Sequence, residues 1–134
     1  MNVVVDTNVV AYYWIPGPFN DQAVTLRVAT DDWLVPRLWR SEFRNVLAGF
    51  LRGGHLGVDE AKALAVAAEA ELLDFERDVD STAVIDLVAS SRLSAYDCEL
   101  VALARSLGIA LVTEDAAILE QFPEVAVSME AFAE

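Results

Sequence analysis

Four acidic residues occupy positions from which their carboxylates could act on one ligand. Asp6 follows a run of three valines, and Asp115 comes shortly after the apolar run at positions 109–112. Asp97 and Glu42 lie in segments with helical periodicity, on or beside the apolar face. Carboxylates brought together raise each other's pKa unless a cation neutralises them. Because no histidine or thiol accompanies them, these oxygen ligands predict Mg²⁺ or Mn²⁺ rather than zinc.

Asp6 and Asp115 each also have a structural interpretation. Both stand where an apolar strand-like run gives way to the next segment, and aspartate is a favoured N-terminal cap of a helix. In a sheet of parallel strands, however, the carboxyl ends of the strands are where ligands bind. Thr113, two residues before Asp115, could offer a hydroxyl to the same site.

Asp97 is the most informative of the four acids. Leu100, Val101 and Ala104 follow it at the spacing of one helix face, so its carboxylate is expected on the apolar side. Burying an unpaired carboxylate is costly, and a metal ion would relieve that cost. The alternative is a capping box with Ser94, in which an acid three residues after the cap satisfies a backbone donor.

Glu42 is expected at the border of the apolar stripe of its helix, beside Val46. From there it could point into a cleft. The alternative is the usual one for a helical glutamate, a solvated side chain paired with Arg40 or Arg44.

The segments that would position these acids alternate between strands and helices. We expect strands at 2–5, 33–36 and 109–112, an edge strand at 125–127, and helices at 20–29, 38–52, 58–73, 81–90 and 94–107, with a short one opening at Asp115. The tail from 129 to 134 is expected to add little. The alternation predicts one α/β domain, residues 1–134, with a parallel sheet. Asp6 and Asp115 then lie outside the carboxyl ends of its strands.

Composition sets the class of protein. The 134 residues are 55 % hydrophobic, which is ample for one buried core. The apolar runs are much shorter than the ~20 residues of a membrane helix, and the first residues show no secretory signal, so we expect a cytoplasmic protein. Cys98 is the only cysteine and cannot form an intrachain disulfide.

The net charge of −13 opposes a simple nucleic-acid-binding surface, because such proteins usually present a basic face. Bound divalent cations would reverse the potential locally. Four of the nine basic residues lie around Glu42: Arg37, Arg40, Arg44 and Arg52. They could line a substrate path, or they could be ordinary solvated charges on a helix face.

Taken in order, four parts of the chain resemble the PIN-domain family and, within it, the VapC-type toxins. They are Val3-Val4-Val5-Asp6-Thr7-Asn8, Glu42, Ser94-Ala95-Tyr96-Asp97 and Leu111-Val112-Thr113-Glu114-Asp115. The acids are 36, 55 and 18 positions apart, and this ordered set, which spans essentially the whole chain, carries the resemblance. It implies a three-layer fold and a metal-dependent endoribonuclease with Asp6, Glu42, Asp97 and Asp115 as its catalytic acids.

The resemblance also implies roles within the site. Asp6, Asp97 and Asp115 would hold one or two Mg²⁺ or Mn²⁺ ions, with Glu42 as a further ligand or as the group that orients water. Asn8 and Thr113 would support the acids. A metal-bound water would hydrolyse the RNA phosphodiester and leave a 5′ phosphate. The family further implies a homodimer, for which the helices within 38–73 offer a surface, and a cognate antitoxin whose arginine could enter the carboxylate pocket.

Two other interpretations remain open. A haloacid-dehalogenase-like phosphatase also has an aspartate after its first strand, as a nucleophile. That family would have a second aspartate where this chain has Asn8 and a lysine near the later acids, whereas Lys62 is the only lysine. A non-catalytic interaction module could use the same acidic pocket to bind arginines of a partner protein.

Overall fold

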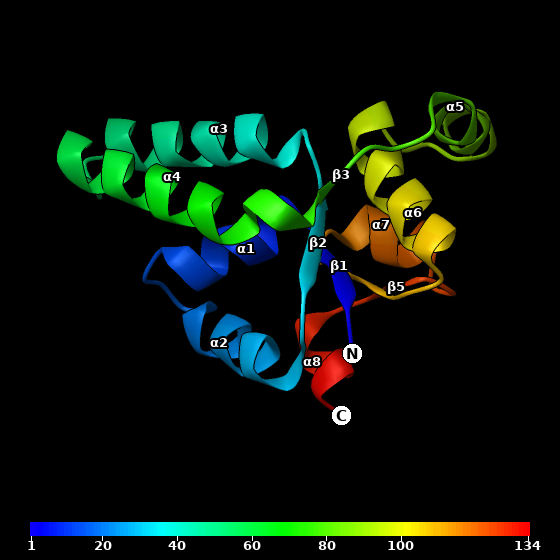
Figure 1. Ribbon diagram of the computed structural model, residues 1–134, viewed down its shortest axis with the longest axis horizontal. Helices are drawn as coiled ribbons and strands as arrows, with labels where there is room; N and C mark the ends of the chain where they lie inside the picture. The colour runs from blue at the N-terminus through cyan, green and yellow to red at the C-terminus, as the bar shows by residue number, and fades with distance from the viewer.

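A five-stranded parallel sheet runs through the centre of the computed structural model, which describes residues 1–134 (Figure 1). Its order is β3-β2-β1-β4-β5. The strands are β1 Val3–Val5, β2 Trp33–Pro36, β3 Glu76–Arg77, β4 Leu111–Val112 and β5 Ala126–Val127. The helices are α1 Thr7–Trp14, α2 Asn20–Ala29, α3 Trp39–Arg52, α4 Val58–Leu72, α5 Ser81–Ser90, α6 Ala95–Leu107, α7 Ala116–Gln121 and α8 Met129–Ala133, with a 3₁₀ turn at Leu73–Phe75.

Successive residues of β1 belong to two separate hydrophobic cores. Val3 and Val5 pack in one core with residues of α1 to α4 and α8, and Val4 packs in the other with residues of α5 to α7. All three valines are fully buried, which explains why the strand is apolar without alternation. Helices therefore cover both faces of the sheet, and the predicted three-layer α/β architecture is confirmed (Figure 1).

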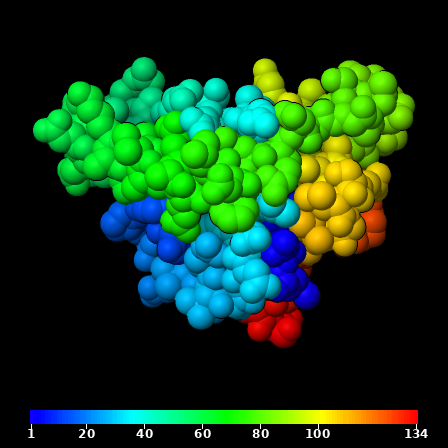
Figure 2. Space-filling model, viewed as in Figure 1, coloured from blue at the N-terminus to red at the C-terminus, as the bar shows by residue number.

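β1 is the point at which the strand order of the sheet reverses, with β2 and β3 on one side and β4 and β5 on the other. From β1 the chain passes through α1 and α2 to β2 and then to β3, toward one edge; from β3 it returns through α5 and α6 to β4, on the other side of β1. The carboxyl ends of β1 and β4 therefore form the topological switch point, where open α/β sheets bind ligands. In the space-filling view, the α3–α4 pair and α5 project to opposite sides of the molecule (Figure 2).

The predicted strands and helices are all present, with ends that move by at most two residues. Three elements were not predicted: α1, β3 and α8. β3 has only two residues, one of them charged, so no apolar run marks it. The expectation that the tail adds little is wrong, because Met129 of α8 is 2 % exposed and packs with Phe132 against the core of α1 to α4. None of the eight helices is long and apolar enough to cross a bilayer.

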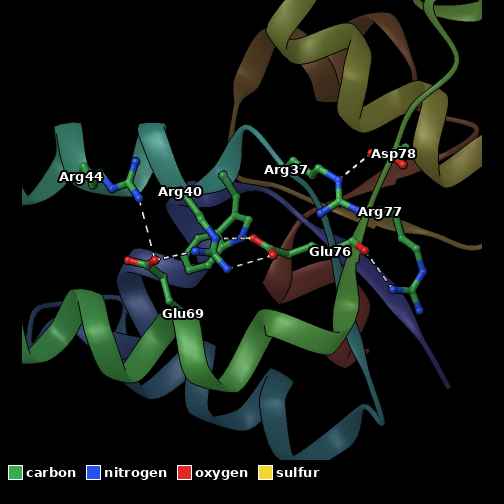
Figure 3. Close-up of polar contacts among 8 residues, drawn as sticks. Arg37, Arg40, Arg44, Glu69, Glu76, Arg77 and Asp78 are labelled. Carbon is green, nitrogen blue, oxygen red and sulfur yellow. Dashed lines mark hydrogen bonds and ion pairs between the residues drawn. The ribbon is translucent and has the colours of Figure 1, made fainter.

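A cluster of ionic hydrogen bonds fixes the start of α3 (Figure 3). Glu76 of β3, only 9 % exposed, accepts hydrogen bonds from Trp39 Nε1 at 2.7 Å and from Arg40 Nε at 2.6 Å and Nη2 at 3.0 Å. Arg40 Nη1 also donates to Glu69 of α4 at 2.7 Å. The Arg40 guanidinium holds the pKa of Glu76 below its usual value. Since α3 carries Glu42, this cluster sets where Glu42 lies.

We expect Glu76→Ala to lower the free energy of unfolding by about 2–3 kcal/mol, because it leaves the Trp39 N–H and the Nε and Nη2 groups of half-buried Arg40 without their acceptor. Asp78→Ala is the matched control. It removes the exposed Arg37–Asp78 pair, with side chains 62 % and 84 % exposed, and should cost less than about 1 kcal/mol. Urea unfolding followed by circular dichroism measures both. Equal losses would contradict the role given to the Glu76 cluster.

Candidate active site

Asp6 and Thr113 meet directly beyond the paired strands β1 and β4. The register Val5↔Val112 makes them the next residues on each strand, and Asp6 N donates to Val112 O at 3.0 Å. Thr113 Oγ1, fully buried, donates to Asp6 Oδ2 at 2.7 Å. Asp6 stands at the N-cap of α1, yet its side chain makes no capping hydrogen bond. Thr113 therefore holds its carboxylate across the sheet, and the backbone N–H groups of Thr7 and Asn8 at the start of α1 also favour its charged form, against the burial that raises its pKa.

Asp115 does cap a helix. Its Oδ1 accepts from Ile118 N at 3.0 Å at the start of α7, as the capping interpretation predicted. Its backbone N–H donates to Thr113 Oγ1 at 3.0 Å. The Thr113 hydroxyl thus bonds to both Asp6 and Asp115, which places the two acids on either side of one buried oxygen.

Glu42 lies at the start of α3 and accepts a hydrogen bond from Thr7 Oγ1 at 2.9 Å. It makes no ion pair with Arg40 or Arg44, whose guanidiniums turn to the acids of β3 and α4 (Figure 3). The interpretation of Glu42 as a solvated, arginine-paired side chain is wrong. Thr7 was not selected from the sequence, although it directly follows Asp6.

Asp97 has a free carboxylate. Ser94 Oγ accepts from Asp97 N at 3.1 Å, which is one half of a capping box. The other half, a hydrogen bond from Ser94 N to the Asp97 carboxylate, is missing, and no backbone group donates to this carboxylate. Burial raises its pKa and outweighs the Ser94 hydroxyl, which is the one group that favours its charged form. The side chain of Asp97 is therefore available to a ligand.

The four acids line one cleft of about 390 Å³ at the switch point. Its remaining lining residues are Thr7, Asn8, Leu38, Ser41, Asn45, Val46 and Tyr96. Leu38, Ser41, Glu42 and Asn45 come from one face of α3, at a spacing that could have identified them in the sequence. Tyr96 is the neighbour of Asp97 and had no such signal.

No arginine or lysine lines this cleft. Arg37 pairs with Asp78. Arg40 pairs with Glu69 and Glu76, and Arg44 pairs with Glu69 (Figure 3). Arg52 lies outside the lining as well, so none of the four arginines around Glu42 in the sequence lines the cleft itself. Arg40 and Arg44 instead connect α3 to β3 and α4. A substrate path along these arginines beyond the cleft stays a prediction.

Burial and mutual repulsion disfavour the charged form of three of the acids. Burial raises the pKa of Asp6, with Asp115 adding to the rise and the Thr113 hydrogen bond opposing it. Burial also raises the pKa of Glu42, to which Asp6, Asp97 and Glu99 add. For Asp97 the causes of the raised pKa are burial, Asp115 and Asp6, in that order. The negative charge of one acid therefore contributes to the raised pKa of another across the cleft.

The donor set fits a hard cation held in an open site. All the candidate ligands are carboxylate, hydroxyl or amide oxygens, and a divalent ion would relieve the repulsion among the acids. As the side chains stand, no three carboxylate, imidazole or thiol groups lie close enough together to hold one ion. Mg²⁺ commonly binds through one or two carboxylates and keeps several waters. The arrangement therefore suits such binding rather than a closed cage of protein ligands.

The fold is similar to several solved structures. The chain matches FitAcB from Neisseria gonorrhoeae with a TM-score of 0.73 and 16 % identity, covering 96 % of this chain and 98 % of that one. It matches PAE2754 from Pyrobaculum aerophilum with a TM-score of 0.71 and 23 % identity, covering 98 % and 95 %. A toxin–antitoxin complex from Klebsiella pneumoniae gives a TM-score of 0.69 at 14 % identity, covering 95 % and 97 %.

No curated protein sequence matches the chain significantly. The family model of the PIN domain matches residues 3–126, from the first residue of β1 into β5. The matched span includes Asp6, Glu42, Asp97 and Asp115 and all of the lining of their cleft. The chain therefore belongs to the PIN-domain family.

Proposed function

We propose that this protein is a metal-dependent endoribonuclease that hydrolyses RNA phosphodiester bonds, and that it is the VapC-type toxin of a type II toxin–antitoxin pair. The observation that carries the proposal is the convergence of Asp6, Glu42, Asp97 and Asp115 on one cleft at the switch point of a PIN domain. The similarity of the fold to a toxin–antitoxin complex supports the second part.

In this proposal Asp6, Asp97 and Asp115 would together hold one or two Mg²⁺ or Mn²⁺ ions, each through one or two carboxylates and bound water. Glu42 would be a further ligand or would orient the attacking water. The ion supplies a water of lowered pKa and neutralises charge on the phosphate. Thr113 fixes the Asp6 carboxylate and Thr7 fixes that of Glu42, so that neither rotates away from the cleft. Hydrolysis of this kind does not use the 2′-hydroxyl of RNA, so the choice of RNA over DNA rests on the family.

The two alternatives receive less support from the site. A phosphatase of the haloacid dehalogenase type lacks its second aspartate, because Asn8 lines the cleft at that position, and its lysine, because Lys62 of α4 is exposed and does not line the cleft. An interaction module would bind a partner through the same acids without cutting RNA. Cleavage of RNA by the protein would distinguish the proposed nuclease from this interaction module.

A groove that leads away from the cleft supports the antitoxin as partner. The acid-lined cleft shares Asn8 and Val46 with a hollow of about 290 Å³, which in turn shares Ile15, Pro16 and Phe50 with a hollow of about 680 Å³. The largest hollow is mostly apolar. A partner segment with apolar side chains in this groove and an arginine among the acids would fill it, the arginine taking the place of the metal. The homodimer that the family implies stays a prediction.

Asp97→Asn should weaken Mn²⁺ binding at least about tenfold and abolish most RNA cleavage, because it removes the charge of an acid whose carboxylate accepts no backbone hydrogen bond. For the same reason, the substitution breaks no backbone hydrogen bond of the fold. Isothermal titration and a cleavage assay measure the two effects. Asp86→Asn, an exposed acid of α5, is the control and should change neither. If the wild type binds no Mn²⁺, or binds Mn²⁺ without cutting RNA, the proposed nuclease activity is contradicted.

The raised pKa values predict a dependence of stability on pH. A carboxylic acid with a raised pKa in the folded state binds more protons there than in the unfolded chain, so its contribution to stability falls as pH rises above the unfolded pKa. In the presence of a chelator, Asp97→Asn should therefore unfold about 2–5 °C above the wild type at pH 7, and at the same temperature near pH 3.5. Mg²⁺ should reverse the order at pH 7. Thermal unfolding scans test this, and a pH-independent difference would contradict it.

Ala63→Arg should lower the affinity for the cognate antitoxin at least about tenfold, because Ala63 is an exposed residue of α4 in the apolar hollow and the new charge would have to be buried there. Ala67→Arg is the control. It lies one turn further along the exposed side of the same helix and outside the hollow. Titration of the antitoxin into each variant gives the affinities. Equal affinities of the two variants would show that the partner does not use the groove.

A further inference from the structure

The cleft has to hold a nucleic acid without a basic side chain of its own. Five of the chain's basic side chains form ion pairs elsewhere: Arg27, Arg37, Arg40, Arg44 and Arg105. The other four, Arg52, Lys62, Arg77 and Arg92, form no side-chain ion pair and lie outside the lining of the cleft. Nucleic-acid binding usually draws most of its affinity from such cations. In this cleft, uncharged side chains must supply part of it.

Tyr96 is an aromatic side chain with no structural role that would account for its position. It is 61 % exposed, it lines the cleft, and it directly precedes Asp97. It takes part in none of the five aromatic contacts of the protein, and its hydroxyl forms no hydrogen bond. The other exposed aromatic ring, Phe19, packs against Tyr12 with 4.8 Å between ring centroids.

Uncharged hydrogen-bonding groups lie on the opposite wall of the cleft. Asn8 of α1 and Ser41 and Asn45 of α3 are exposed, line the cleft, and use their side chains in no hydrogen bond within the protein. α1 and α3 pack on one face of the sheet and α6, which carries Tyr96, on the other. Asp6 and Asp115, which follow the central strands β1 and β4, therefore lie between a wall with the aromatic ring and Asp97 and a wall with free amide and hydroxyl groups and Glu42.

Building on the proposed ribonuclease, we propose that Tyr96 stacks on a base beside the phosphate that is cut. Stacking on an aromatic ring needs no positive charge and is available to every base. A base inside a duplex is already stacked on its neighbours and is not free to lie on the ring. Asn8 and Asn45 are placed to donate to the backbone or base edges of the same strand from the other wall. A strongly acidic protein can bind a single strand in this way.

The test is the steady-state cleavage of a single-stranded RNA oligonucleotide by Tyr96→Ala and Tyr96→Phe, with Mg²⁺ present. Loss of stacking should raise KM about 5- to 100-fold in Tyr96→Ala and change kcat less than about threefold, while Tyr96→Phe keeps the KM of the wild type. Mn²⁺ titration of Tyr96→Ala should match the wild type, since the acids are untouched. Leu107→Ala, an exposed residue at the far end of α6, is the control and should change nothing.

Two results separate this inference from the function on which it rests. If the wild type cleaves RNA and Tyr96→Ala has an unchanged KM, or if the same strand is cut equally fast within a duplex, Tyr96 is not a stacking platform and the ribonuclease stands. If the wild type cuts no RNA while it binds Mn²⁺, the ribonuclease falls and the inference falls with it. A raised KM that Tyr96→Phe restores, together with slow cleavage of the duplex, supports the assignment.

Discussion

The hydrogen bond from Thr113 to Asp6 joins the two strands on which the whole site depends. β1 and β4 are adjacent in the sheet although 105 residues lie between Val5 and Leu111. Those residues form six helices, two strands and the 3₁₀ turn, and they include Glu42 and Asp97. Once these strands pair, α1, α6 and α7 all begin around the same crevice. The acids then meet because of the topology of the sheet, since no two of them are near in sequence.

Repulsion among the acids is opposed by contacts outside the cleft. Hydroxyl groups of Thr113 and Thr7 hold two carboxylates in place, and the Glu76 cluster holds the start of α3 from its far side. Of the arginines near Glu42 in sequence, Arg40 and Arg44 belong to that brace. No cationic side chain lines the cleft, so the acids leave it with a strongly negative potential, which would attract a divalent ion and repel free phosphate.

The sequence predicted four of the five strands, and it located the four acids that line the cleft, because each leaves a local trace. Buried strands appear as apolar runs, and Asp6 and Asp115 stand at their ends. It could not predict what each side chain touches, since those partners come from distant segments. Arg40 and Arg44 lie within one helical turn of Glu42. Only the tertiary structure shows that both arginines pair with Glu69, that Arg40 also pairs with Glu76, and that Thr7 donates a hydrogen bond to Glu42. β3, with two residues, and α8, anchored by Met129, were missed for the same reason: their stability comes from packing and not from a local pattern.

In the proposed function, the same negative potential would explain how one cleft can serve a metal, a substrate and an inhibiting partner. An empty cluster of acids would repel RNA, so the ion would have to bind before the polyanion, and the neutral side chains of Tyr96 and Asn45 would then contribute contacts that do not depend on charge. An arginine from a partner protein would neutralise the same acids but would bring no water to activate. Metal and arginine would therefore compete for one site with opposite consequences. The groove joins the cleft to the apolar hollow beside Phe50 and offers a protein partner an area of contact that a bare ion lacks. The affinity from this additional contact would let the partner displace the ion.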